Sequence, residues 1–302
     1  MGSSPSKHRR VAITGLGIIS PIGIGRETFT SNLLAGKSGV TKITVLPASS
    51  VPHHIGGEVS DFNEKTAKEY IKQRKSIKVM CREIQLGVGA ATLALADAGI
   101  AEGSITPERI GVEYGANLML SPPEILFDAG KACAEPDTLK FHPEMWGTAG
   151  LSNMGPLWLL QYLPNMPACH IGIFADARGP NNSLTMAEVS GNLALGEAIR
   201  IIQRGSADVM ITGTTGTTLH AVKSLHAVLW DKLADQDGPP EEASRPFDAD
   251  RTGQVVAEGA ATLILEDEEH ATKRGAKVLG YVLGTGSSCV ASADGTPDLK
   301  RA

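Results

Sequence analysis

The amino-acid sequence predicts an α/β fold from its composition and from the order of its apolar segments. The chain has 34 glycines but only 4% aromatic residues, which favours tight strand-to-helix turns and small-residue packing over an aromatic-rich β-sandwich. Short β-branched runs also alternate with helical segments along the chain. With 302 residues, of which 42% are hydrophobic and 20% charged, the chain can bury one large core or two moderate ones.

The first predicted strand covers residues 11–14 and runs into a glycine turn. Gly15 and Gly17 look like the start of a dinucleotide-binding motif, but the position of its third glycine holds Ser20. In addition, Pro21 delays the helix whose N-terminus should hold a pyrophosphate. We therefore predict a structural role for these glycines.

The remaining elements follow from apolar periodicity and from glycine stops at residues 99 and 205. Helices are predicted over 85–98, 165–173, 189–204 and 267–274, and strands over 110–114, 183–186, 207–213, 255–265 and 278–284. The segment 183–213 is a βαβ unit with a sharp first turn. Residues 119–155, which are rich in Pro, Gly and Met, predict a long excursion with short helices, typical of a substrate-lining or partner-contacting insertion.

Charge and cysteine content exclude several classes of function. The formal net charge of −5 gives no footprint for nucleic acid or an anionic membrane, and an acidic partner would need a local basic patch. The four cysteines contain no CxxC pair, so we expect neither disulfides nor a metal site, and a reducing cytoplasm fits best. No apolar run reaches the ~18 residues of a membrane span, and the polar start lacks a signal-peptide core.

Three segments in order carry a specific resemblance: RRVAITGLGIISPIG at 9–23, GPNNSLTMAEVSGNLALGEAIRIIQRGSADVMITG at 180–213, and ASRPFDADRTGQVVAEGAATLILE at 243–266. Together they resemble β-ketoacyl-acyl-carrier-protein synthases of the elongating, type II kind. The resemblance implies a thiolase fold with αβαβα layers. It further implies a complete N-terminal half over residues 1–250 and the start of an incomplete C-terminal half over 251–302.

The chemistry implied by the resemblance is condensation of acyl and malonyl groups bound to acyl carrier protein, in fatty acid or polyketide biosynthesis. In the family a cysteine at a strand-to-helix turn takes the acyl group, because the positive helix N-terminus favours its thiolate and backbone N–H groups stabilise the oxyanion. No cofactor is implied. The expected assembly forms through the edge strand near the nucleophile, as a homodimer or as a heterodimer with a cysteine-containing synthase subunit.

Glu188 occupies the nucleophile position in the GPNNSLTMAEVSG motif, and none of the four cysteines can easily replace it. A neutral glutamine at this position in relatives resembles an acylated cysteine, whereas a glutamate is charged. At about 4 Å and an effective dielectric near 20, it would repel a malonyl carboxylate by roughly 4 kcal/mol. Several roles stay open: a non-condensing, chain-length-factor-like partner subunit in which the carboxylate only caps its helix, a malonyl-carrier-protein decarboxylase or another acyl-carrier reaction, or ordinary catalysis.

Two further residues are predicted along the substrate pocket. Gln254 stands where the family commonly has a pocket phenylalanine, which indicates a more polar pocket, and Ser190 follows the nucleophile position without an activating base in the sequence. Arg251 and Glu258 are expected to form structural pairs. The family's downstream histidine and lysine motifs do not occur in the 302 residues, so we expect a fragment of a longer protein.

Overall fold

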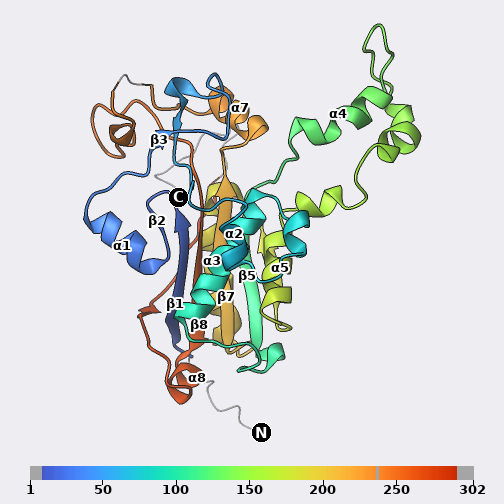
Figure 1. The fold of residues 1–302 in the computed structure, drawn as a ribbon. Coiled ribbons are helices and arrows are strands. Elements are labelled where there is room, and N and C mark those ends of the chain that lie inside the picture. Colours follow the sequence, from blue (N-terminus) through green and yellow to red (C-terminus); the bar gives the residue numbers. More distant parts are fainter. Residues whose placement is uncertain (1–8, 236–237, 291–302) are drawn as a thin grey trace.

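The computed structural model describes residues 9–235 and 238–290, which form a mixed sheet with helices on both faces (Figure 1). The strands are β1 (Val11–Ser20), β2 (Gly23–Ile24), β3 (Thr41–Lys42), β4 (Ile55–Gly56), β5 (Ile110–Ala116), β6 (Asn181–Leu184), β7 (Val209–Thr217), β8 (Glu258–Asp267) and β9 (Gly280–Val282). The helices are α1 (Arg26–Leu34), α2 (Ala67–Tyr70), α3 (Arg82–Asp97), α4 (Pro123–Ala132), α5 (Met166–Phe174), α6 (Ser190–Gln203), α7 (Ala221–Trp230) and α8 (Glu268–Lys273). Short helical turns cover Pro52–His54, Ser76–Val79, Pro107–Arg109, Pro143–Met145, Trp146–Gly150, Trp158–Gln161, Ala187–Val189 and Pro240–Glu242.

The main sheet has the strand order β2-β1-β8-β7-β5-β6, with β9 also paired to β1. β5 is parallel to both β6 and β7, while β8 runs antiparallel to its neighbours β7 and β1. The predicted βαβ unit is confirmed as β6–α6–β7, and β5 lies between its two strands. The free edge of the parallel part is therefore β6, the strand that leads to Glu188.

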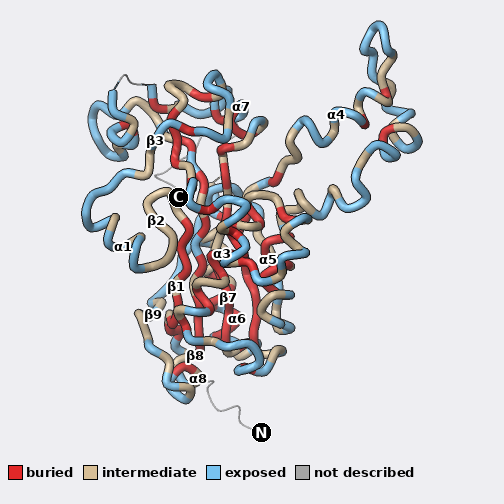
Figure 2. The backbone as a smooth tube through the Cα atoms, viewed as in Figure 1, coloured by how far each residue is buried: buried red, intermediate tan, exposed pale blue. Residues whose placement is uncertain are grey.

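Helices α3 and α5 cover one face of the sheet, and α6 covers the other. The hydroxyl of Tyr114 on β5 lies 3.3 Å from the Gly87 carbonyl oxygen of α3, so even-numbered positions of β5 face that helix. On the opposite face, a Cβ on Gly115 would lie 2.7 Å from the backbone of Ser190 in α6. Figure 2 shows that burial is concentrated along these strands and α3.

The glycines of β1 allow close contact with α3. A Cβ on Gly17 would lie 1.9 Å from the Ala90 carbonyl oxygen, and one on Gly15 would lie 2.4 Å from that of Ala94. The structural interpretation of these glycines is thus confirmed. It also explains why β1 continues to Ser20, well past the predicted end, because these glycines belong to the strand and not to a turn.

The domain boundary expected at residue 250 stays a prediction, and strand β8 lies just after it in the sequence. It separates β8 from the first part of the chain, whereas β8 lies between β1 and β7 and pairs with both along its length. A strand in the middle of a sheet cannot be divided from its hydrogen-bonded neighbours. β8 therefore belongs to the same sheet as the strands before residue 250.

Some element bounds differ from the sequence prediction. β6 begins at Asn181, two residues earlier than expected, and α1 and α7 were not predicted. α1 has no buried residue, and most of the apolar side chains of α7 are exposed, so neither shows a clear apolar stripe toward the core.

The excursion predicted over residues 119–155 is present as an arm that extends away from the sheet, which we define as residues 118–165 (Figure 1). It consists of α4 and three short turns. Figure 2 shows that the arm is largely exposed, and its exposed apolar side chains are Leu118, Ile125, Phe127, Leu139, Phe141, Met145, Leu151, Leu157, Leu159 and Leu160. Across the described ranges, no helix has the length and apolar character that crossing a membrane requires.

Candidate active site

The turn that carries Glu188 connects edge strand β6 to helix α6 through the helical turn Ala187–Val189. Ala187 has a φ of 49°, in the left-handed region that costs a non-glycine residue roughly 1–2 kcal/mol. Surrounding contacts must hold this conformation. The sharp turn predicted from the sequence is thus present, with Glu188 directly after the strained residue.

Ser190 supplies the contacts that hold the turn. Its hydroxyl oxygen accepts a hydrogen bond from the Met186 amide at 2.7 Å and lies 2.7 Å from the Ala187 carbonyl oxygen, to which it donates. The same oxygen lies 3.1 Å from the carbonyl oxygen of Ala116 at the end of β5. The side chain is 1% exposed. The Ser190 hydroxyl faces main-chain atoms beneath the turn, and the described cavity of Glu188 is lined without this residue, so its place along the substrate pocket stays a prediction.

Glu188 lies at a cavity of about 490 Å³ on the edge of the sheet where β5, β7 and β1 end and β8 begins. The carboxyl ends of parallel strands commonly form such a site. The lining residues are Ile18, Ile19, Ser20, Phe29, Asn117, Ala187, Glu188, Thr214, Thr215, Gly216, Thr217, Thr218, Ala257, Gly259, Ala260 and Ala261. Sequence analysis had singled out only Glu188 for this site. The run of threonines after Gly213 in the sequence was the signal from which the polar wall of this cavity could have been predicted.

The cavity wall consists mainly of small and hydroxylated residues, and Glu188 is the one charged side chain among the described residues that line it. No second carboxylate, histidine or lysine lines the described wall to exchange a proton with Glu188. Asn117 and the threonines can instead hydrogen-bond a polar ligand. The described cavity therefore has an uncharged wall apart from a single carboxylate, that of Glu188.

The Glu188 side chain is exposed to solvent. The N-cap of α6 is Val189, without a side-chain cap, so the role of Glu188 as a helix cap is corrected. The helix N-terminus still stabilises a nearby anion, by about 0.3–1 kcal/mol. Exposure also changes the expected repulsion of a malonyl carboxylate, because a dielectric near that of water reduces it to about 1 kcal/mol at 4 Å.

A buried ion pair behind the cavity wall was not predicted from the sequence. Lys223 of α7 donates to the carboxylate of Glu83 at the start of α3, and both residues are under 9% exposed. Thr215 of the cavity wall joins this pair, since its hydroxyl donates to the Glu83 carbonyl oxygen at 2.7 Å.

Burial and the Glu83 carboxylate raise the pKa of Cys81 to about 12, so this thiol stays protonated.

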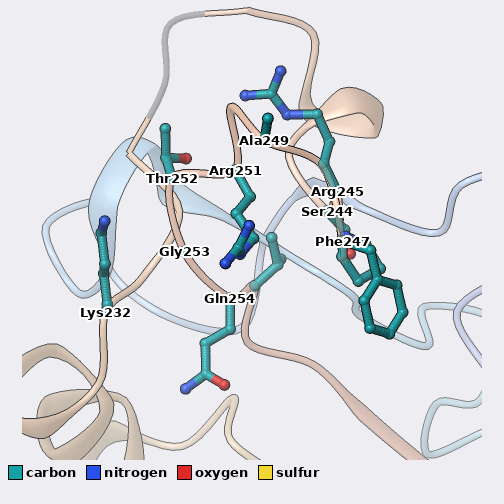
Figure 3. Close-up of a pocket in the computed structure, with 11 residues that line it drawn as sticks. Lys232, Ser244, Arg245, Phe247, Ala249, Arg251, Thr252, Gly253 and Gln254 are labelled. Atoms are coloured by element: carbon teal, nitrogen blue, oxygen red, sulfur yellow. The ribbon is translucent and has the colours of Figure 1, made fainter.

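Gln254 lies in a different cavity from Glu188. This second cavity, of about 960 Å³, is lined by the cations Lys232, Arg245 and Arg251 together with the fully exposed Phe247 (Figure 3). The backbone N–H of Gln254 donates to the Lys232 carbonyl oxygen at 2.9 Å, and this bond fixes the loop beside α7. In the described chain, Glu188 and Gln254 thus line two separate cavities, and the role of Gln254 in a substrate pocket stays a prediction.

The two residues expected to form structural pairs have separate partners. Glu258 forms an ion pair with Arg82 at 2.6 Å and accepts a hydrogen bond from the Val59 amide at 3.0 Å. Arg251 donates to the Asp248 carbonyl oxygen at 2.8 Å. Both contacts hold chain segments together.

The cysteines do not supply another nucleophile at this site. All four are free, and none lines the cavity of Glu188. Cys169 is half-buried on α5, on the sheet face opposite to α6. Within residues 9–235 and 238–290, no group of three or more His, Cys, Asp or Glu side chains could hold a metal ion.

A strained strand-to-helix turn at the carboxyl edge of a mixed sheet is the arrangement of thiolase-fold condensing enzymes, and the chain belongs to the β-ketoacyl synthase family. Residues 8–271 match the model of its N-terminal domain. The 3-oxoacyl-[acyl-carrier-protein] synthase 2 of Synechocystis is 32% identical over 94% of this chain, and that of Rhizobium meliloti is 35% identical over 93%. The chain spans 64% of the length of both relatives.

Solved structures agree with this assignment. The ishigamide ketosynthase/chain length factor is similar with a TM-score of 0.73 and 26% identity, over 92% of this chain and 63% of that one. A β-ketoacyl synthase from Burkholderia phymatum has a TM-score of 0.73 and 27% identity, over 91% of this chain and 63% of its own. A type II polyketide ketosynthase in complex with its acyl-carrier protein has a TM-score of 0.65 and 25% identity, over 90% of this chain and 61% of that one.

Proposed function

We propose that this protein handles acyl or malonyl groups on acyl carrier protein, in fatty acid or polyketide biosynthesis, as a non-condensing subunit of the chain-length-factor kind. One observation carries the proposal: the residue at the nucleophile position is an exposed glutamate, the single charged group of the described cavity wall. The cavity would bind the carrier-linked chain without forming a covalent acyl-enzyme.

The chemistry of a carboxylate supports a non-condensing role. Attack of Glu188 on a thioester would form a mixed anhydride, which is more reactive than the thioester it replaces and does not accumulate. Cysteine avoids this problem because its acyl form is itself a thioester. Ser190 offers no alternative, since its buried hydroxyl is hydrogen-bonded to the turn.

Malonyl decarboxylation is a second candidate, favoured by the exposure of Glu188. Because water screens the carboxylate, its repulsion of a malonyl group falls to about 1 kcal/mol, which does not prevent binding. Asn117 and the threonines of the wall would hydrogen-bond the thioester oxygen on which negative charge develops. Glu188 would then act only through its charge.

We further propose that the protein works in the cytoplasm as a dimer, with a second copy or with a cysteine-containing synthase. β6 is an edge strand with its outer side unpaired in the described sheet, and the arm exposes apolar side chains. The four free cysteines support a reducing compartment. One of the similar structures is itself a ketosynthase/chain length factor.

The test compares the full-length protein with Glu188→Gln and Glu188→Cys variants, using malonyl- and acyl-carrier protein as substrates. We expect neither condensation nor appreciable malonyl decarboxylation by the parent protein. In the glutamine variant, decarboxylation should rise by about fivefold, because the loss of ~1 kcal/mol of repulsion corresponds to that factor. Product release is followed by mass spectrometry of the carrier protein.

The Glu188→Cys variant shows whether the rest of the site supports chemistry. Acylation of the introduced thiol would show that the cavity admits the carrier-linked thioester. Rapid decarboxylation by the parent protein would instead favour the second candidate, and condensation by the parent would contradict both. Glu64→Gln, which changes an exposed glutamate outside the cavity, is the matched control.

A further inference from the structure

A second carboxylate, that of Glu113, is buried next to β6, the strand that leads to the active-site turn. It is on β5, and it is fully buried at 0% exposure. One carboxyl oxygen, Oε1, accepts a hydrogen bond from the side-chain amide of Asn182 on β6 at 3.2 Å. The other, Oε2, has no hydrogen-bond partner among the described residues. Native proteins rarely leave a buried charged oxygen unpaired.

The groups around Glu113 do not neutralise a negative charge. As an odd-numbered position of β5, it faces α6, and its register partner on β7 is Thr212, whose buried hydroxyl also lacks a described partner. The nearest charge on α6 is Glu197, whose carboxylate already binds Arg204 at 3.0 Å and Arg200 at 3.6 Å. No described arginine or lysine forms an ion pair with Glu113.

These surroundings favour the neutral acid. Burial, followed by the charge of Glu197, raises the pKa of Glu113 to about 7, while the Asn182 hydrogen bond and Arg204 oppose the shift. The carboxyl group therefore changes charge near neutral pH, in contact with the strand that leads into the active-site turn.

The connection to the active site is short. Asn182 stands on edge strand β6, which pairs only with β5 among the described strands. β6 ends at Leu184, and the chain reaches Glu188 four residues later. β6 and the strained turn at Ala187 are therefore separated by only two residues.

We propose that Glu113 is a proton-operated latch: in its neutral form it stays buried beneath the closed edge strand β6, and in its ionised form the uncompensated charge on Oε2 favours opening of β6, which lets water reach the carboxylate and frees the turn that positions Glu188. The proposal concerns the fold of this chain and does not depend on whether the site binds or decarboxylates its ligand. The sign follows from linkage. Between an unfolded pKa of 4.5 and a folded pKa of about 7, the folded state binds the extra proton, so stability decreases as pH rises through this window.

Hydrogen–deuterium exchange of the full-length protein at pH 5.5, 7.0 and 8.5, corrected for intrinsic exchange, tests the latch. In the wild type, amides of residues 181–189 should lose protection by roughly tenfold over this range, because the shifted carboxyl disfavours the closed state once ionised. Glu113→Gln keeps the acceptor for Asn182 but cannot ionise. Its protection in this segment should stay constant with pH, and Glu64→Gln should behave as the wild type.

Equal pH dependence in the wild type and in Glu113→Gln would overturn the latch. If the glutamine variant does not fold, isotope-edited infrared titration of the carboxyl groups in the wild-type protein decides instead. A buried carboxyl that titrates near pH 7 supports the proposal, and the absence of any such band above pH 6 contradicts it.

Discussion

At the scale of single residues, Ser190 determines the geometry of the active-site turn. Its hydroxyl connects the Met186 amide, the Ala187 carbonyl and the end of β5, all within 3.1 Å. This fixed position compensates for the left-handed backbone of Ala187. Ser190 thus acts as a support for the turn that carries Glu188.

Replacing Ser190 by alanine should destabilise the protein by about 1–3 kcal/mol, because the Met186 amide and the Ala187 and Ala116 carbonyl groups lose the buried hydroxyl as a partner. Urea unfolding followed by circular dichroism measures the change. The control is Ser104→Ala, whose exposed hydroxyl binds only the Ala101 carbonyl oxygen and should matter by no more than about 0.5 kcal/mol. Equal effects of the two substitutions would contradict the support role.

At the scale of elements, the contact of β1 with α3 sets how closely the helix approaches the sheet. Gly15 and Gly17 of β1 leave no room for a side chain against the α3 backbone. On the helix side, a Cβ on Gly89 would lie 2.7 Å from Ile19. Small residues on both surfaces let two backbones meet, and the edge of this contact forms the cavity floor at Ile18 and Ile19.

Gly17→Ala should therefore destabilise the protein by roughly 3 kcal/mol or more, because the added methyl group would meet a rigid helix backbone at 1.9 Å. Thermal unfolding measures the loss. Gly280→Ala in β9 is the matched control, since nothing lies within 4 Å of its added Cβ. A Gly17→Ala protein as stable as that control would show that α3 can move away from β1.

At the scale of the whole molecule, an ion-pair network joins several strands at the ends that lie opposite to the active site. Asp208, just before β7, binds Arg109 at 2.7 Å and Arg9 at 3.0 Å. Arg9 also reaches Asp267 at the end of β8, at 3.1 Å. The network therefore connects the beginnings of β1, β5 and β7 with the end of β8.

The charge network predicts loss of stability in acid. The Arg109 guanidinium, helped by Arg9, holds the pKa of Asp208 at about 2, below the 3.8 of an unperturbed aspartate. Its stabilising contribution is complete above pH 3.8 and is lost as pH falls toward 2. Asp208→Asn should cost about 1 kcal/mol at pH 7, after allowance for solvent screening, and little near pH 2. Chemical denaturation across this range measures it, with Asp137→Asn as the exposed control.

The carboxylates of Asp208 and Glu113 change the stability of the whole protein in opposite directions with pH. Asp208 loses its contribution as pH falls below 3.8, whereas Glu113 becomes unfavourable as pH rises toward 7. These two groups together place the highest stability between those limits.

The sequence by itself determined the family and the α/β class, and it predicted a substitution at the nucleophile position. Those properties rest on local patterns: the ordered motifs, the apolar periodicity and the register that puts Glu188 at the nucleophile position. The helix ends at Gly99 and Gly205 followed in the same way, since both glycines adopt positive φ angles that end a helix. The turn before α6 was also predictable, because strand, turn and helix are neighbours in sequence.

The tertiary structure alone decided which distant residues share an environment. Gln254 was predicted along the substrate pocket, and the loop that carries it packs against Lys232 and lines a different cavity from that of Glu188. The Glu83–Lys223 pair and the isolation of Glu113 join segments far apart in the chain, and the sequence has no local signal for such contacts. The place of β8 between β1 and β7 is of the same kind, because strand pairing depends on the three-dimensional path of the chain and not on sequence order.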